Sequence, residues 1–148
     1  MRELLRVWKD RRGRQHEGMI VVAIIGILAA IAMPKFAELI RKSNEGATKG
    51  NLGAVRSALS IFYGDTRGVY PAHPALLTLE GRYLAELPKA KTPQYHPDSN
   101  AVVLGLGKSD LNDQGGWLFI ADPADEDYGT MFVNCTHTDS KGVRWFAY

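Results

Sequence analysis

The feature that most constrains this chain is an uncharged apolar run of 15 residues, Met19 to Met33, with Glu17 before it and Lys35 after it. A membrane-spanning helix needs about 20 apolar residues, with a lower limit near 17, so the run is short for this role by itself. Local thinning of the bilayer or snorkelling of flanking side chains would make up the difference. The run therefore predicts the membrane or assembly half of a helix.

Basic residues are concentrated just before this run. Residues 1–14 contain six basic and two acidic residues, a charge of +4, so residues 15–148 carry −2 of the chain's total of +2. A short basic stretch before an apolar run is typical of a cytoplasmic flank. The sequence pI of 8.7 therefore does not indicate a nucleic-acid-binding face. We expect residues 1–18 to form a basic leader-like segment.

A cleavable signal peptide is the main alternative for the N-terminus. The basic stretch, the apolar run and the small-x-small sequence Ala30-Ile31-Ala32 stand in the order that signal peptidase requires. This alternative predicts a soluble secreted binding domain, released by cleavage after Ala32. A buried core helix is a weaker alternative, because it does not explain the adjacent basic cluster.

A helical pattern continues past the apolar run, which favours a membrane or assembly helix. The continuing apolar positions are spaced by three or four residues and comprise Phe36, Ile40, Leu52, Val55, Leu59 and Phe62. Basic residues step by sevens along another face, at Lys42, Lys49 and Arg56. We expect one helix over residues 19–63, apolar all round at 19–33 and amphipathic at 34–63, with a kink at Pro34.

Residues 64–148 are expected to form a small β-rich region after a proline-rich connection with one short helical turn. The strand candidates, rich in β-branched or aromatic residues, are Ala101–Leu104, Trp117–Ala121, Thr130–Cys135 and Val143–Tyr148. Turn sequences at 112–116 and 139–142 favour hairpins, and hence an antiparallel sheet. The expected fold is α+β, a ladle in which a long N-terminal helix packs through residues 47–63 on a small antiparallel sheet.

Residues 19–36, MIVVAIIGILAAIAMPKF, resemble the N-terminal helix of type IV pilins and of the pseudopilins of type II secretion. The order of small and large residues, the proline and the amphipathic continuation carry the resemblance. Downstream, Gly68-Val69-Tyr70-Pro71 is similar to the Tyr-Pro that follows this helix in many pseudopilins. The resemblance implies a pilin-like fold and a structural, non-enzymatic subunit of a type IV pilus or a pseudopilus.

The resemblance also implies a location and partners. The chain would be held in the bacterial inner membrane by a single helix, with a periplasmic C-terminal domain, and would then enter a filament that can reach the cell surface. Its partners would be copies of itself, other pilin-like subunits, and prepilin peptidase if the leader is functional. Small residues that allow close helix contacts are Gly26, Ala29 and Ala30. No nucleic acid is indicated.

The leader departs from the family pattern. In the family, prepilin peptidase cuts after a glycine, the new N-terminus is usually a methylated phenylalanine, and a glutamate lies seventeen residues before the proline. Glu17 has this spacing from Pro34. The same register places Arg12 at the cleavage glycine and Gly13 at the phenylalanine, so cleavage there is in doubt.

A shifted register offers a second processing point, between Gly18 and Met19, but it loses the glutamate match. In the family the glutamate pairs with the N-terminal amine of a neighbouring subunit, since a buried carboxylate needs such a partner. The alternative is that Glu17 is an ordinary polar residue at a membrane boundary.

Catalytic and metal chemistry has little support in the sequence. Cys135 and His137 would share one face of a strand, but no oxyanion-stabilising motif accompanies them, so we expect a buried apolar cysteine and no enzyme. His73, His96 and His137 lack the short spacings of zinc sites. Weak candidates for calcium, which some pseudopilins bind, are Asp110, Asp113, Asp122, Asp125 and Asp127. A solvated acidic loop is the favoured interpretation, so no cofactor is expected.

Overall fold

The computed structural model describes residues 2–148, with side chains described from Glu17 onward. The elements, in which η marks a 3-10 turn, are α1 (Arg2–Asp65), η1 (Pro74–Gly81), β1 (Val102–Gly105), η2 (Lys108–Asp110), β2 (Trp117–Ile120), β3 (Met131–Val133) and η3 (Trp145–Ala147). These elements confirm the α+β class. The chain divides into two compact units, residues 1–40 and 41–148, and α1 contributes to both.

In the first unit, the apolar side chains of α1 are open to the surroundings. Every large apolar side chain from Met19 to Ile40 is between 52% and 70% exposed. Pro34 lies inside the helix, where it removes one backbone donor, yet the helix continues past it. The described part of this unit therefore has no apolar core of its own.

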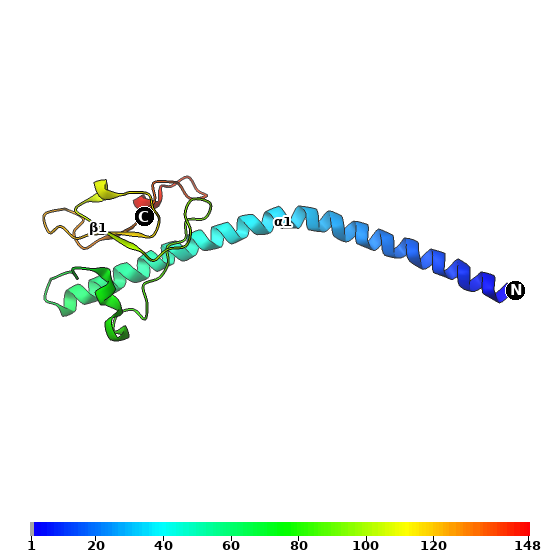
Figure 1. The fold of residues 1–148 in the computed structure, drawn as a ribbon, viewed down its shortest axis with the longest axis horizontal. Helices are drawn as coiled ribbons and strands as arrows, with labels where there is room; N and C mark the ends of the chain where they lie inside the picture. Colours follow the sequence, from blue (N-terminus) through cyan, green and yellow to red (C-terminus); the bar gives the residue numbers. More distant parts are fainter. Residues whose placement is uncertain (1) are drawn as a thin grey trace. The chain divides into compact units, whose positions relative to one another are not determined.

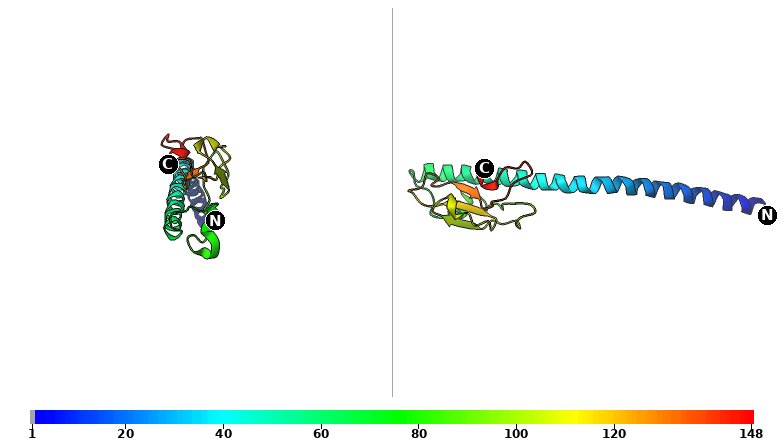
Figure 2. Two further views of the ribbon diagram at one scale, coloured as in Figure 1. Left: turned by 90° about the vertical axis from the view of Figure 1, so that its left-hand side faces the viewer. Right: turned by 90° about the horizontal axis from the view of Figure 1, so that it is seen from above.

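In the second unit, α1 buries one face, as the spacing of its apolar residues predicts. Leu52, Val55 and Leu59 are at most 3% exposed, and Phe62 packs beside them. They meet the side chains of Trp117, Phe119, Met131 and Val133 from β2 and β3. Figures 1 and 2 show the sheet lying along one side of the C-terminal part of α1. Each large side chain buried here contributes about 1.5–3 kcal/mol.

The three strands form one mixed sheet in the order β1-β2-β3. β2 and β3 are antiparallel, with Leu118 opposite Phe132, as expected. β1 runs parallel to β2, with Val103 opposite Leu118, so the prediction of a purely antiparallel sheet was wrong. The reason lies in residues 106–116, which form a crossover containing η2 instead of a hairpin turn. The backbone turns there through positive φ angles at Asp113, Gly115 and Gly116.

The segment Val143–Tyr148 is not the fourth strand that its composition suggested. It begins with a turn in which Asp139 donates its N–H to the carbonyl of Val143 at 2.8 Å, and it ends in η3. A 3-10 turn places side chains three residues apart on one face. Trp145 and Tyr148 therefore lie together, with ring centroids 6.0 Å apart, and Trp145 is buried in the core.

Candidate assembly surface and polar contacts

The first candidate site is the exposed apolar part of α1. Gly26, Ala29 and Ala30 lie three or four residues apart, and so on one face of the helix. A Cβ added at Gly26 would meet no atom within 4 Å, so the surface around it is open. Leaving the large apolar side chains of residues 19–40 in water would cost on the order of 20 kcal/mol. Such a surface is suited to lipid or to other helices.

The segment from Glu17 is also the one candidate membrane span among the described residues. By length and composition, the helix is apolar enough to cross a bilayer. Glu17, Gly18 and Met19 are exposed at its beginning, and Pro34 is exposed within it. Arg12 and Gly13 lie outside the residues whose side chains the structure describes.

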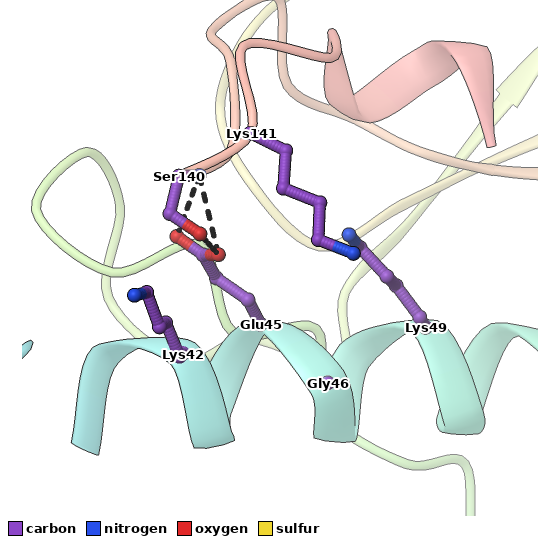
Figure 3. Close-up of a pocket in the computed structure, with 6 residues that line it drawn as sticks. All are labelled: Lys42, Glu45, Gly46, Lys49, Ser140 and Lys141. Atoms are coloured by element: carbon purple, nitrogen blue, oxygen red, sulfur yellow. Dashed lines mark hydrogen bonds between the residues drawn. The ribbon is translucent and has the colours of Figure 1, made fainter. Parts of the chain in front are cut away.

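The amphipathic half of α1 presents charged side chains to the C-terminal segment. Glu45, 6% exposed, accepts hydrogen bonds from the backbone N–H and the hydroxyl of Ser140, and it lies 3.3 Å from the Nε of Arg41. Figure 3 shows Glu45 pointing from the helix to Ser140. Arg56 donates to the carbonyls of Met131 and Tyr148, at 3.0 and 2.6 Å. These contacts hold the chain after β3 against the helix.

Lys49 makes the most buried of these ion pairs. Its Nζ lies 2.6 Å from Oδ2 of Asp139 and 2.7 Å from the hydroxyl of Tyr148. Burial by itself would raise the pKa of Asp139. Hydrogen bonds from Lys49, Tyr148 and the backbone N–H groups of Val143 and Lys141 outweigh it, and they hold the pKa of Asp139 well below its usual range.

The groove around Glu45 is occupied by these internal contacts. It is lined by Lys42, Lys49 and Lys141 beside Glu45 (Figure 3). Ser140 already satisfies Glu45, and Asp139 already neutralises Lys49. Glu45 and Lys49 therefore hold Ser140 and Asp139 against the helix. Because Lys49 is already paired, it is no argument for an anionic ligand. The seven-residue spacing of Lys42, Lys49 and Arg56 was a signal of this polar face, but their partners could not be read from the sequence.

The loop aspartates proposed for calcium mostly make local contacts. Asp110 accepts from the N–H of Leu106 at 2.6 Å, and Asp122 and Asp125 accept from the N–H groups two residues further on. Asp127 forms an ion pair with Lys108 at 2.9 Å, which brings the two loops together. Asp113 faces a different neighbourhood, with His96 and His137. These contacts do not test calcium binding, for which the five aspartates were only weak candidates.

Cys135 and His137 are adjacent, but they are not arranged for nucleophilic catalysis. The Sγ of Cys135 and the Oδ1 of Asp113 both approach the same ring nitrogen, Nδ1 of His137, at 3.5 and 3.3 Å. A nucleophile, base and orienting carboxylate need opposite nitrogens of the imidazole. Burial also raises the pKa of Cys135 to about 11, which keeps the thiol protonated.

The chain thus combines an exposed apolar helical segment with a small α+β unit. Comparison with known proteins shows which proteins it resembles. The chain is 40% identical over 72 residues to fimbrial protein EcpC of Eikenella corrodens, covering 46% of each protein. It is 49% identical over 49 residues to the type IV major pilin PilA of Myxococcus xanthus, covering 33% of this chain and 22% of that protein.

A third relative is the type IV narrow pilus major component PilA5 of Thermus thermophilus, 37% identical over 62 residues, or 42% of this chain and 53% of that protein. The chain spans about half or less of the length of these relatives. No family model and no solved structure matches it. In the part of its sequence that the relatives share, the chain is similar to type IV pilins and a fimbrial protein.

Proposed function

We propose that this chain is a structural subunit of a type IV pilus, stored in the bacterial inner membrane by Met19–Met33 and polymerised through the same helix. The observation that carries the proposal is that every large apolar side chain from Met19 to Ile40 is exposed. Lipid would cover them before assembly, and the helices of neighbouring subunits would cover them afterwards. The relatives are named as pilus components or as a fimbrial protein, and these names support a pilus subunit over a pseudopilus subunit.

Close approach of the helices is the step that assembly requires. Hydrocarbon is as apolar as leucine, so helices gain little from excluding lipid and depend on packing and hydrogen bonds. The small residues Gly26, Ala29 and Ala30 allow backbones to come close. Glu17 would supply one strong polar contact, its carboxylate pairing with the N-terminal amine of a neighbouring subunit.

Gly26→Leu tests this proposal in the bacterium that encodes the chain. Because a Cβ added at Gly26 would meet no atom within 4 Å, the variant should fold and reach the membrane normally. We expect its amount in sheared surface material to fall at least about tenfold, since a loss of roughly 1.4 kcal/mol of packing per contact already gives that factor. Gly64→Leu, another exposed helical glycine with open space around it, is the matched control. Equal assembly of both variants with the wild type would overturn the proposal.

Processing is tested by the intact mass and the N-terminal sequence of protein from membranes and from sheared material. A chain beginning at Gly13 or Met19 would support cleavage by prepilin peptidase, in the first or the second register. A soluble chain beginning near Met33 would instead support the secreted binding domain and overturn the filament. If the mature chain begins at Gly13, Glu17→Gln should block assembly without changing processing, whereas an ordinary boundary residue would tolerate the substitution. If the chain begins at Met19, Glu17 is removed with the leader and takes no part in the filament.

A further inference from the structure

Four side chains with metal-binding atoms converge at one place in the second unit. His96 comes from the loop before β1, Asp113 from the crossover between β1 and β2, and Cys135 and His137 from the segment after β3. One ligand atom of each lies within 4.8 Å of all the others. Among the residues with described side chains, this is the one such group. Sequence spacing alone does not predict this group, because the four residues lack zinc-type spacing.

Three of the six separations within the cluster are close to those of a tetrahedral metal site, and all six are within 4.8 Å. Asp113 Oδ1 lies 3.1 Å from His96 Nε2 and 3.3 Å from His137 Nδ1, and Cys135 Sγ lies 3.5 Å from His137 Nδ1. Zinc bonds of about 2.0–2.3 Å at tetrahedral angles place neighbouring ligand atoms about 3.3–3.6 Å apart. These ligand atoms thus already stand at nearly the separations that a shared ion would impose.

The polar contacts of the cluster centre on the carboxylate of Asp113. Asp113 Oδ1 already accepts the backbone N–H of Thr136 at 2.7 Å, in addition to its two histidine neighbours. His137 Nδ1 faces both this carboxylate and the thiol of Cys135, and the thiol also has Asp113 and Thr92 as hydrogen-bond partners. A cation at the centre would replace these hydrogen bonds with a bond from each ligand atom to the same ion.

The surrounding backbone is shaped to bring the four residues together. Gly115 has φ of 78°, and a Cβ there would lie 2.8 Å from the Cβ of His96, so glycine allows that loop to approach. Asp113 itself has φ of 57°, a strained conformation for a residue with a side chain. Asn112 and Asn134 bridge the two segments with hydrogen bonds of 2.6 and 3.1 Å.

The geometry points to a Zn²⁺ site formed by His96, Asp113, Cys135 and His137. One thiolate, one carboxylate and two neutral imidazoles suit tetrahedral zinc, and the two negative charges neutralise the ion. On binding, the S–H bond of Cys135 breaks, the proton passes to solvent, and the thiolate lone pair bonds to the metal. The His137 side chain is 40% exposed and gives solvent access, whereas Cys135 is fully buried behind it.

The metal would crosslink three irregular segments. A chain with a single cysteine has no internal disulfide to do this. The aromatic ring of Tyr95 stacks on His137 at a centroid distance of 4.1 Å and orients it, in the manner of an outer-shell contact. A structural role, in which the ion fixes the surface formed by the loops around residues 96, 113 and 137, follows from this arrangement.

Cobalt substitution tests the site directly. The full-length protein in detergent micelles is stripped with EDTA and titrated with Co²⁺, which reports tetrahedral geometry and sulfur ligation through its visible and charge-transfer absorption. We expect a sulfur-to-cobalt band that saturates at one equivalent and disappears when one equivalent of Zn²⁺ is added. Absence of the sulfur band, or weak binding without a fixed stoichiometry, would overturn the proposal whatever the variants do.

Substitutions then assign the ligands. His137→Gln and Cys135→Ser should each weaken zinc binding by more than about 100-fold, beyond the effect of an outer-shell change. His73→Gln is the matched control, because His73 only accepts the N–H of Ala75 at the beginning of η1. Tryptophan fluorescence of the metal-free variants confirms that they are folded. Unchanged affinity in His137→Gln, or an equal loss in His73→Gln, would contradict the assignment.

Discussion

The two halves of α1 use similar residues in opposite ways. Leu28 and Leu59 lie on the same helix, yet Leu28 is 61% exposed and Leu59 only 2%. Residues 19–33 are apolar all round, and the large apolar side chains of residues 19–40 are exposed in the described chain, whereas residues 41–65 bury one stripe and use another face for ion pairs. A helix buried on one side within its own chain needs only one apolar stripe.

This difference suggests that one half of α1 serves the stability of the folded chain and the other half serves assembly. The second half of α1 contributes to the folding free energy of residues 41–148, because its contacts form within the chain. Under the proposed function, the first half would make its contacts with lipid or with other subunits. Substitutions in the two halves should therefore have distinct measurable effects, and the predictions below test that separation.

Leu59→Ala should have the largest effect on stability. Removing a fully buried leucine leaves a cavity among Trp117, Met131 and Val133, which costs about 2–5 kcal/mol in the free energy of unfolding. Urea unfolding of the full-length protein in detergent micelles, followed by tryptophan fluorescence, measures this loss. Trp117 and Trp145 report on the core directly, since both are buried.

Leu28→Ala is the matched control on the same helix. It removes the same atoms from an exposed position, so the free energy of unfolding should change by less than about 0.5 kcal/mol. The amount of protein in sheared material should decrease instead. If Leu28→Ala destabilised residues 41–148 as much as Leu59→Ala, the separation of stability from assembly would be wrong.

Asp139→Asn should lower the free energy of unfolding by about 1–3 kcal/mol, the range for removing a charged hydrogen-bond partner in a mostly buried setting. The substitution leaves Lys49 without its carboxylate and weakens the turn that Asp139 forms with Lys141 and Val143. Asp65→Asn is the control. Its pair with Arg82 is exposed, so its loss should cost less than about 1 kcal/mol in the same unfolding assay.

The same carboxylate predicts a pH dependence of stability. Because the pKa of Asp139 is lower in the folded chain than in the unfolded chain, its stabilising contribution is complete near neutral pH and is lost as the pH falls. The difference in urea midpoint between wild type and Asp139→Asn should thus shrink below about pH 5. A difference that stayed constant down to pH 3 would show that the charge of Asp139 is not the cause.

The sequence predicted those parts of the fold that depend on local periodicity. The spacing of Leu52, Val55 and Leu59 identified the buried stripe, and β-branched and aromatic residues identified β2 and β3. It failed where pairing depends on the path of a connection, as in the parallel pairing of β1 with β2. It also failed at Val143–Tyr148, where contacts of Trp145 and Tyr148 with distant residues outweigh strand propensity.

The apolar surface of the candidate site could be predicted, because an uncharged run needs no knowledge of tertiary structure. The polar contacts could not. Glu45 and Ser140 are 95 residues apart in the sequence. The four side chains of the proposed zinc site come from three segments that only the folded chain brings together. The spacing of the histidines argued against a zinc site. Such spacing is informative only when the ligands lie in one local motif, and these ligands come from separate segments.

Gly53→Ala should have the smallest effect on the free energy of unfolding, and this effect should be an increase, unlike those of the substitutions above. Gly53 lies in the second half of α1, and an added Cβ would meet no atom within 4 Å. Alanine restricts the unfolded chain and favours the helix, so stability should rise by about 0.5–1 kcal/mol. Gly26→Ala makes the same change in the first half and should leave the unfolding of residues 41–148 unaffected. A comparable gain from Gly26→Ala would mean that the two halves of α1 unfold as one unit.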